Sequence, residues 1–282
     1  MKIGNREFDM TDQTYIMGIL NVTPDSFSDG GRYQELDAAL KRAEQMASEG
    51  ADILDIGGES TRPGHTQISV EEEINRVAPV IEKIKANFDI PISIDTYKSE
   101  VALAAIKAGA DLVNDIWGLR YDAKMARCIA ENDAACCISH NRENASYHAF
   151  PADVIKDLAE SVIIATDAGI ARNKMILDPG IGFAKTAEQN LQLLAHMDWL
   201  HVLELPLLLG TSRKSVIASV SEPLLPVEQR QEGTYVTTVF AVLNDYRFVR
   251  VHDVAENKRV IDMTKAIISR REQKGHGLYQ NL

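Results

Sequence analysis

The sequence predicts an α/β protein, a single TIM (β/α)₈ barrel with a short N-terminal β-hairpin, on three observations. Eight short runs of β-branched and apolar residues recur along the 282 residues. They alternate with amphipathic stretches that favour helices, and each run ends on polar residues, usually beside Gly or Pro. Strands that alternate with helices form a parallel sheet, and in a closed barrel their polar ends meet at one face, where the active site lies.

The predicted strands are mostly apolar, as expected of strands that are covered on both faces. They are residues 16–20, 53–56, 92–94, 112–113, 136–139, 175–177, 207–209 and 248–249. The helices predicted between them are residues 36–49, 70–87, 99–107, 122–131, 152–168, 187–197, 227–243 and 257–270. Three of these helices end close to Gly50, Gly109 and Gly169, where a residue in the left-handed conformation is expected.

Residues 1–10 are predicted to form the hairpin at the N-terminal end of the barrel, with Gly4 and Asn5 as its turn. No low-complexity tract or long Pro/Ser linker divides the chain, so residues 1–282 are expected to form one domain. Eight strand–helix units favour the closed barrel. A doubly wound open sheet is the alternative, although the Gly-x-Gly-x-x-Gly fingerprint of dinucleotide-binding sheets is absent from the sequence.

The amino-acid composition limits the kinds of molecule that the protein can bind. The chain is 25% charged and 45% apolar, as in soluble globular proteins. A net charge of −11 argues against nucleic acid, which needs clustered Lys and Arg, but not against one small anion in a cleft. No apolar stretch reaches the roughly 18 residues of a membrane span, and no signal peptide is recognisable. With three cysteines and no Cys-x-x-Cys pair, we expect a cytoplasmic protein with reduced thiols and no membrane partner.

Three polar residues end three different predicted strands: Asp95, Asn114 and Asp178. Together they offer carboxylate and amide acceptors, with one amide donor, near the barrel axis. Such a set suits a flat heterocycle with an amino-pyrimidinone edge, whose N–H groups need fixed acceptors. Each residue could instead cap the helix that follows it. The occurrence of all three at one end of a barrel favours ligand binding.

Cations follow the later strands. Lys214 comes after the seventh strand, and Arg250 and His252 follow the eighth, two residues apart and therefore on one face. Because late-strand loops are the usual phosphate site in this fold, we expect an anion clamp there, which Arg62 can reach from the second strand's loop. Arg213 cannot share the direction of its neighbour Lys214, and we expect it to be a solvated surface charge.

Two loops are rich in Gly and Pro, residues 21–31 and 57–64. Both are long enough to cover the site and exclude water from a reactive intermediate. The histidines do not have the spacing of a zinc site, and no Gly-x-Ser-x-Gly elbow is present.

Ordered segments over nearly the whole chain carry a resemblance to a known family. They are residues 18–31, 55–64, 93–96, 114–115, 177–183, 212–214 and 250–253. In these segments the chain resembles dihydropteroate synthase, a (β/α)₈-barrel family of the folate pathway. The resemblance implies a transferase that joins 6-hydroxymethyl-7,8-dihydropterin diphosphate to 4-aminobenzoate and releases diphosphate.

The resemblance also implies roles for individual positions. The expected pterin diphosphate-binding residues are Thr61, Asp95, Asn114, Asp178, Lys214, Arg250 and His252. The expected aminobenzoate-binding residues are Phe27, Thr61, Arg62, Pro63, Phe183 and Ser215. The expected catalytic residues are Lys214, Asp178, Asp29, Arg250 and His252. Asn21 is expected to help hold Mg²⁺, the expected cofactor, against the diphosphate, and the family resemblance implies a homodimer.

The chain departs from the family pattern at the fifth strand, where residues 139–141 are Ser-His-Asn in place of a Met-His-Met-like stretch. Two other functions are possible. A pterin-dependent methyltransferase domain shares the barrel and the pterin site, but it needs no diphosphate clamp of Lys214, Arg250 and His252. A non-catalytic pterin-binding paralogue would not need these residues or Asn21 either.

Overall fold

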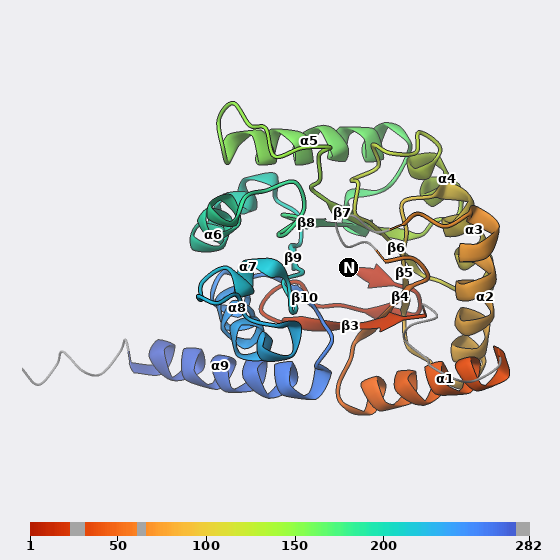
Figure 1. The fold of residues 1–282 in the computed structure, drawn as a ribbon, viewed down its shortest axis with the longest axis horizontal. Helices are drawn as coiled ribbons and strands as arrows, with labels where there is room; N and C mark the ends of the chain where they lie inside the picture. The colour runs from red at the N-terminus through yellow and green to blue at the C-terminus, as the bar shows by residue number, and fades with distance from the viewer. Residues whose placement is uncertain (23–31, 61–65, 275–282) are drawn as a thin grey trace, which may run out of the picture.

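The computed structural model describes residues 1–22, 32–60 and 66–274. Eight parallel strands curl into a barrel that helices surround (Figure 1). The strands are β3 (Tyr15–Asn21), β4 (Ile53–Gly57), β5 (Ile92–Asp95), β6 (Leu112–Asp115), β7 (Ala135–Ser139), β8 (Met175–Asp178), β9 (Leu208–Leu209) and β10 (Phe248–Val251). Their order in the sheet is β8-β7-β6-β5-β4-β3-β10-β9, and a parallel bridge between Leu177 and Leu207 joins the two edges. The predicted barrel is confirmed, and the open-sheet alternative is wrong.

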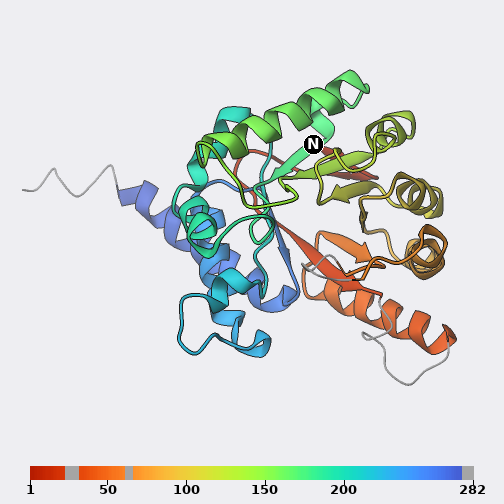
Figure 2. The same ribbon diagram turned by 45° about the horizontal axis from the view of Figure 1, so that its top comes forward.

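The helices lie outside the barrel, between successive strands (Figures 1 and 2). They are α1 (Arg32–Ser48), α2 (Val70–Asn87), α3 (Ser99–Ala108), α4 (Met125–Glu131), α5 (Ala152–Asp167), α6 (Ala187–Ala195), α7 (Ser215–Ala218), α8 (Gln231–Leu243) and α9 (Val254–Lys274). Short 3₁₀ turns accompany them: η2 (Arg172–Lys174), η3 (Met197–Leu203) and η4 (Val227–Gln229). Three predicted helices were too long: residues 187–197 include the first residue of η3, residues 227–243 include all of η4, and residues 122–131 start three residues before α4.

Local signals account for the helix ends. The hydroxyl of Ser69 accepts a hydrogen bond from the backbone N–H of Glu72 and so caps α2. Thr186 and Gln189 form a capping box at the start of α6. At the end of α3, Gly109 has φ of 117°, a conformation that residues with a Cβ rarely adopt. The predicted left-handed residue after this helix is confirmed.

The N-terminal hairpin closes one end of the barrel, as predicted. Strands β1 (Lys2–Ile3) and β2 (Arg6–Glu7) pair antiparallel around a turn at Gly4. Ile3 and Phe8 belong to the apolar cluster inside the barrel, where the Phe8 ring lies 5.8 Å from that of Phe248. The hairpin therefore fills the N-terminal end and leaves the polar strand ends at the opposite one.

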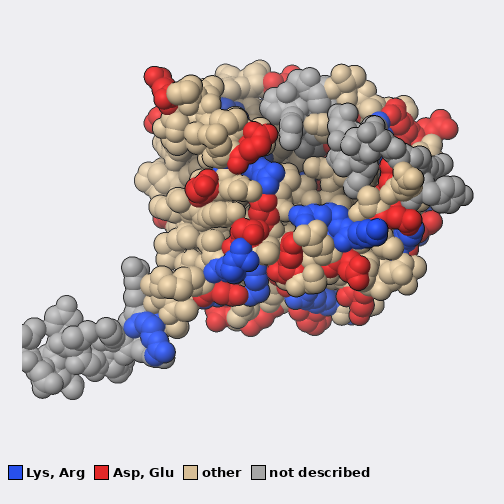
Figure 3. Space-filling model, turned by 60° about the horizontal axis from the view of Figure 1, so that its bottom comes forward, with Lys and Arg blue, Asp and Glu red and all other residues tan. Residues whose placement is uncertain are grey.

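The surface is mixed in charge. On the face shown in Figure 3, Lys and Arg side chains lie among Asp and Glu side chains. Within the ranges that the structure describes, none of the helices combines the length and apolar character needed to cross a membrane.

Candidate active site

The sheet register brings the predicted acceptors to one end of the barrel. Gly57 pairs with Asn21 on one side and with Asp95 on the other. Asp95 in turn pairs with Asn114, and Asp178 is the last residue of β8. Because all these strands run parallel, the three predicted acceptors lie at the same end.

Four buried side-chain oxygens at this end have no hydrogen-bond partner among the described residues. They are Asp55 Oδ1, Ser93 Oγ, Asp95 Oδ1 and Asn114 Oδ1. Buried polar atoms are nearly always paired in proteins, so a group of four on neighbouring strands requires an explanation. Oxygens in this arrangement can accept the N–H groups of a flat polar ring that enters the barrel end.

Arg250 lies between two carboxylates in this layer. Its Nε donates to Asp55 Oδ2 at 2.5 Å, and its Nη2 donates to Asp95 Oδ2. Burial alone would lower the pKa of Arg250, but the two carboxylates hold it above its ordinary value. Burial raises the pKa of the Asp95 carboxyl, and the Arg250 guanidinium opposes that rise. Asp55 had no predicted role, although its position two residues before Gly57 puts it on the same face of β4.

A second pair of charges lies across the barrel end. Asp178 Oδ1 accepts the backbone N–H of Gly180 at 2.8 Å, and burial raises the pKa of its carboxyl while Lys214 opposes the rise. Burial lowers the pKa of Lys214 to about 8, and Asp178 acts in the opposite direction. The Lys214 ammonium donates to the carbonyl of Ile181 at 2.5 Å and lies 4.3 Å from the centre of the Phe183 ring.

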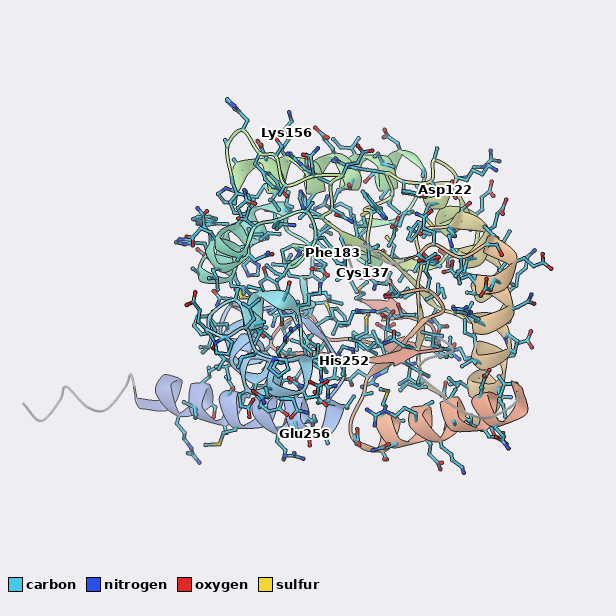
Figure 4. The ribbon with its side chains drawn as sticks, viewed as in Figure 1. Asp122, Cys137, Lys156, Phe183, His252 and Glu256 are labelled. Atoms are coloured by element: carbon cyan, nitrogen blue, oxygen red, sulfur yellow. The ribbon has the colours of Figure 1, made fainter. Side chains whose placement is uncertain are left out.

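The hydroxyl of Ser212 fixes the imidazole of His252. It accepts the backbone N–H of His252 at 3.2 Å and lies 2.9 Å from Nδ1. In the tautomer that carries its proton on Nε2, Nδ1 accepts the Ser212 hydroxyl proton and Nε2–H can donate to an anion. In Figure 4, Phe183 lies toward the middle of the barrel and His252 at its wall beside β3, whereas Lys156 and Asp122 lie among the outer helices.

The loops that carry Lys214 and His252 are tied together by a neighbouring pair. Arg213 is held to Asp253 by two contacts, Nη2 to Oδ1 at 2.5 Å and Nε to Oδ2 at 3.1 Å. Arg213 is therefore not the solvated surface charge that we predicted. Its left-handed backbone, with φ of 57°, turns it away from Lys214 and toward Asp253.

Asn21 offers one oxygen at the end of β3. An ideal Cβ built on Gly57 would lie 3.6 Å from Asn21 Oδ1 and 3.6 Å from Asp95 Cβ, so both side chains flank this glycine. Over residues 1–22, 32–60 and 66–274, no three His, Cys, Asp or Glu side chains gather as metal ligands. Mg²⁺ commonly takes one or two protein oxygens and completes its shell with water and substrate phosphates. This donor set fits an ion shared with a diphosphate.

Five predicted site residues lie outside the described residues: Phe27, Asp29, Thr61, Arg62 and Pro63. Of the other predicted aminobenzoate residues, Phe183 contacts Lys214, and Ser215 is the exposed first residue of α7. The strand that departs from the family pattern is β7. It contributes Ser139, which is buried and whose Oγ lies 3.4 Å from Asp178 Oδ2. A polar group therefore borders the site at this position.

Comparison with known proteins gives consistent matches. A family model described as "Pterin binding enzyme" matches residues 17–252. The dihydropteroate synthase of Clostridium beijerinckii is 54% identical over 271 residues, which are 96% of this chain and 100% of that protein. A crystal structure of the Clostridium difficile dihydropteroate synthase in the presence of pteroic acid has a TM-score of 0.89 and 51% identity, covering 93% of this chain and 99% of that one. The Xanthomonas albilineans enzyme with 4-aminobenzoic acid has a TM-score of 0.86 and 41% identity, covering 92% and 94%.

Proposed function

This chain belongs to the dihydropteroate synthase family of pterin-binding enzymes, and from that premise we propose how its residues bind and join the two substrates. The substrates are 6-hydroxymethyl-7,8-dihydropterin diphosphate and 4-aminobenzoate, and the products are 7,8-dihydropteroate and diphosphate. The observation that carries the proposal is the group of buried, unpartnered oxygens beside two fixed cations, Arg250 and Lys214.

The pterin ring binds at the ends of β5, β6 and β8. Its amino-pyrimidinone edge presents several N–H groups, and Asp95, Asn114 and Asp178 supply the acceptors. A ring that donates to these oxygens satisfies buried groups that would otherwise cost about 1–3 kcal/mol each. The charges of Asp178 and Lys214 interact with each other. A ring inserted between the two side chains therefore meets an acceptor on one side and a cation on the other.

The diphosphate binds at the cations that follow the last two strands. Arg250 and His252 donate to its oxygens, His252 through Nε2–H, and Thr61 adds a contact from the second loop. Mg²⁺, held by Asn21, would supply further neutralisation of the leaving group's charge. Arg250 is already shared between Asp55 and Asp95, so its position is set before the substrate arrives. Fixed donors of this kind stabilise charge that develops in the transition state.

The reaction breaks the bond between the exocyclic methylene carbon and the diphosphate oxygen, whose electron pair leaves with diphosphate. The positive charge on the methylene spreads into the pterin ring, where Asp178 and Asp95 stabilise it, together with Asp29 from the first loop. The amino nitrogen of 4-aminobenzoate then bonds to the methylene carbon and releases a proton to solvent. An arylamine is unprotonated at neutral pH, so positioning carries this step.

The aminobenzoate lies beside Lys214, between Phe183 and Ser215. Phe27, Arg62 and Pro63 approach it from the first two loops. Support for this half of the site is the contact between the Phe183 ring and the Lys214 ammonium, which joins the proposed pterin and aminobenzoate positions.

The chain acts as one domain, residues 1–282, and as a homodimer. Apolar side chains are exposed along α8 and α9, including Phe240 at 45% and Met263 at 62%. Exposed apolar groups on adjacent helices are removed from water when a second copy covers them. Its cysteines are free thiols, two of them buried in β7, as in proteins of the reducing cytoplasm.

The test is a product assay with purified protein, Mg²⁺, pterin diphosphate and 4-aminobenzoate. We expect dihydropteroate and diphosphate to form in equal amounts. Pterin binding without product would instead indicate a non-catalytic paralogue. Transfer of a methyl group to or from a pterin cofactor would indicate the methyltransferase alternative.

A further inference from the structure

A partly buried polar network lies under the loop that joins β8 to α6, residues 179–186, here called the β8–α6 loop. Lys185 Nζ is 2.8 Å from His140 Nδ1, 2.9 Å from the carbonyl oxygen of Gly180 and 3.1 Å from that of Phe183. An ammonium group has three N–H donors, and each has an acceptor here. Lys185 therefore ties the end of β7 to two points of the loop.

His140 connects Lys185 to a helix. The imidazole is fully buried, and its Nε2 lies 3.0 Å from Asp157 Oδ2 on α5. Because Lys185 donates to Nδ1, the neutral ring carries its proton on Nε2 and donates it to Asp157. Burial lowers the pKa of His140 to about 4, so the ring is neutral at physiological pH. Arg142 Nε holds the same carboxylate at 2.6 Å, and Lys185 is thereby anchored to a rigid element.

Two further contacts hold the same loop. The hydroxyl of Tyr147 donates to the carbonyl of Ala184 at 2.8 Å, and the backbone N–H of Gly182 donates to Asn190 Oδ1 on α6 at 2.8 Å. Ala184 has φ of 43°, which is uncommon for a residue with a Cβ and needs support from its surroundings. The loop is thus fixed from the α5 side and from the α6 side.

This loop makes both of the close contacts to the Lys214 ammonium described above. The carbonyl of Ile181 accepts its hydrogen bond, and the Phe183 ring lies beneath it. Gly182, between them, is so close that an ideal Cβ there would lie 3.0 Å from Lys214 Cδ. A shift of the loop would therefore move the Lys214 side chain.

We propose that Lys185 is a positioning residue for the aminobenzoate half of the reaction, because it holds the β8–α6 loop so that Ile181 and Phe183 keep the Lys214 ammonium in place. The inference rests on the proposed function, in which Lys214 and Phe183 border the aminobenzoate. Lys185 itself contacts no substrate. Asp178 adjoins the loop, but Asp95 and Asn114 stand on other strands, so loss of Lys185 leaves most of the pterin acceptors in place and affects aminobenzoate use more than pterin binding.

The experiment compares Lys185→Met with wild type in steady-state kinetics in which each substrate is varied in turn. Loss of the two hydrogen bonds to the loop, and of the one to His140 that anchors them, is expected to raise KM for 4-aminobenzoate about tenfold or more, with KM for pterin diphosphate changed less than about threefold. Lys185→Arg keeps the charge and several donors, and it is expected to recover much of the loss.

The matched control is Lys174→Met. Lys174 also donates to a backbone carbonyl, that of Asp133 at 2.5 Å, but it precedes β8 at the opposite end of the strand. Both Michaelis constants are expected to stay at their wild-type values. A purely structural role for Lys185 would lower the melting temperature and move both constants together, or neither, and that result would overturn the inference.

A double-mutant cycle tests whether Lys185 acts on aminobenzoate binding through Phe183. If Lys185 acts through Phe183, then Lys185→Met and Phe183→Ala together raise KM for 4-aminobenzoate by less than the product of their separate effects. Independent effects would overturn the inference.

Should Lys185→Met not fold, Tyr147→Phe removes a milder contact with the same loop, and an unchanged KM for 4-aminobenzoate in that variant would overturn the inference. Absence of product with wild type would instead refute the proposed function.

Discussion

The ammonium of Lys214 is one of the pH-sensitive charges of the proposed site. Burial lowers its pKa to about 8, although Asp178 opposes the shift. Since this pKa lies below that of an ordinary lysine, the cation is present at lower pH and is lost as pH rises through about 8. We expect kcat/KM for pterin diphosphate, which reports ionisations of the free enzyme, to fall about tenfold for each unit above that pH. A profile that stays flat to about pH 10 would contradict a role for this cation.

Replacement of Lys214 tests the same charge without a change of pH. Lys214→Met keeps an apolar chain over Phe183 but removes the ammonium, so kcat/KM is expected to fall at least about 100-fold, as when one preorganised donor is removed. The melting temperature is expected to stay close to that of wild type. Loss of folding, measured by circular dichroism, would show that the residue is structural instead.

The sequence was sufficient to predict which strand-end residues would meet. Asp95 and Asp178 end their strands and Asn114 is the last residue but one of β6, and the parallel sheet brings such ends together. It was not sufficient for Asp55 or Arg213, whose partners come from strands or loops far away in the chain. A period of two predicts the face of a side chain, but the distance to a charge on another strand depends on the barrel's closure.

Among the structural elements, the β8–α6 loop depends on one glycine. Gly180 has φ of 67°, and an ideal Cβ there would lie 1.8 Å from the carbonyl oxygen of His140. Gly180→Ala is therefore expected to lower the free energy of unfolding by about 3 kcal/mol or more, measured by urea denaturation.

A second glycine provides the control for this substitution. Gly169 also has a positive φ, 99°, but its ideal Cβ would lie 3.9 Å from the nearest neighbour, Ala130 Cβ. Gly169→Ala is expected to cost only about 1–2 kcal/mol, from backbone strain alone. Equal losses in the two variants would mean that the contact with His140 is not what requires Gly180.

Helix prediction worked best where the helix is long and periodic, as for α2, whose predicted bounds match the structure. It missed α7, because four residues are too few to show a period of 3.6. It also extended two helices into 3₁₀ turns, since apolar residues at Met197 and Val227 continue the helical pattern while the backbone tightens.

At the scale of the whole molecule, the number of strand–helix units predicted the closed barrel. The turn residues Gly4 and Asn5 predicted the hairpin that closes its N-terminal end. The composition does not predict which outer surface of the barrel would form a homodimer interface. Helices α8 and α9, which carry exposed apolar side chains, lie on the opposite side of the barrel from α5 in Figure 1. That placement provides the comparison needed to test the proposed homodimer.

We expect Phe240→Glu on α8 to convert a dimer to a monomer, because a buried carboxylate at an apolar interface is costly. Ile163→Glu on α5, which is 57% exposed in the structure, is expected to leave the dimer intact. Light scattering measures the mass of each variant. A wild-type protein that is monomeric at all concentrations would refute the homodimer.

The most direct test of the account is calorimetric titration of a pterin into wild type, Asp178→Asn and Asn114→Leu. If these side chains accept the N–H groups of the ring, each substitution is expected to weaken binding about 100-fold or more, since the ring's donors lose buried acceptors. Both variants are expected to remain folded. Wild-type affinity in either folded variant would contradict the claim that these strand ends bind the pterin.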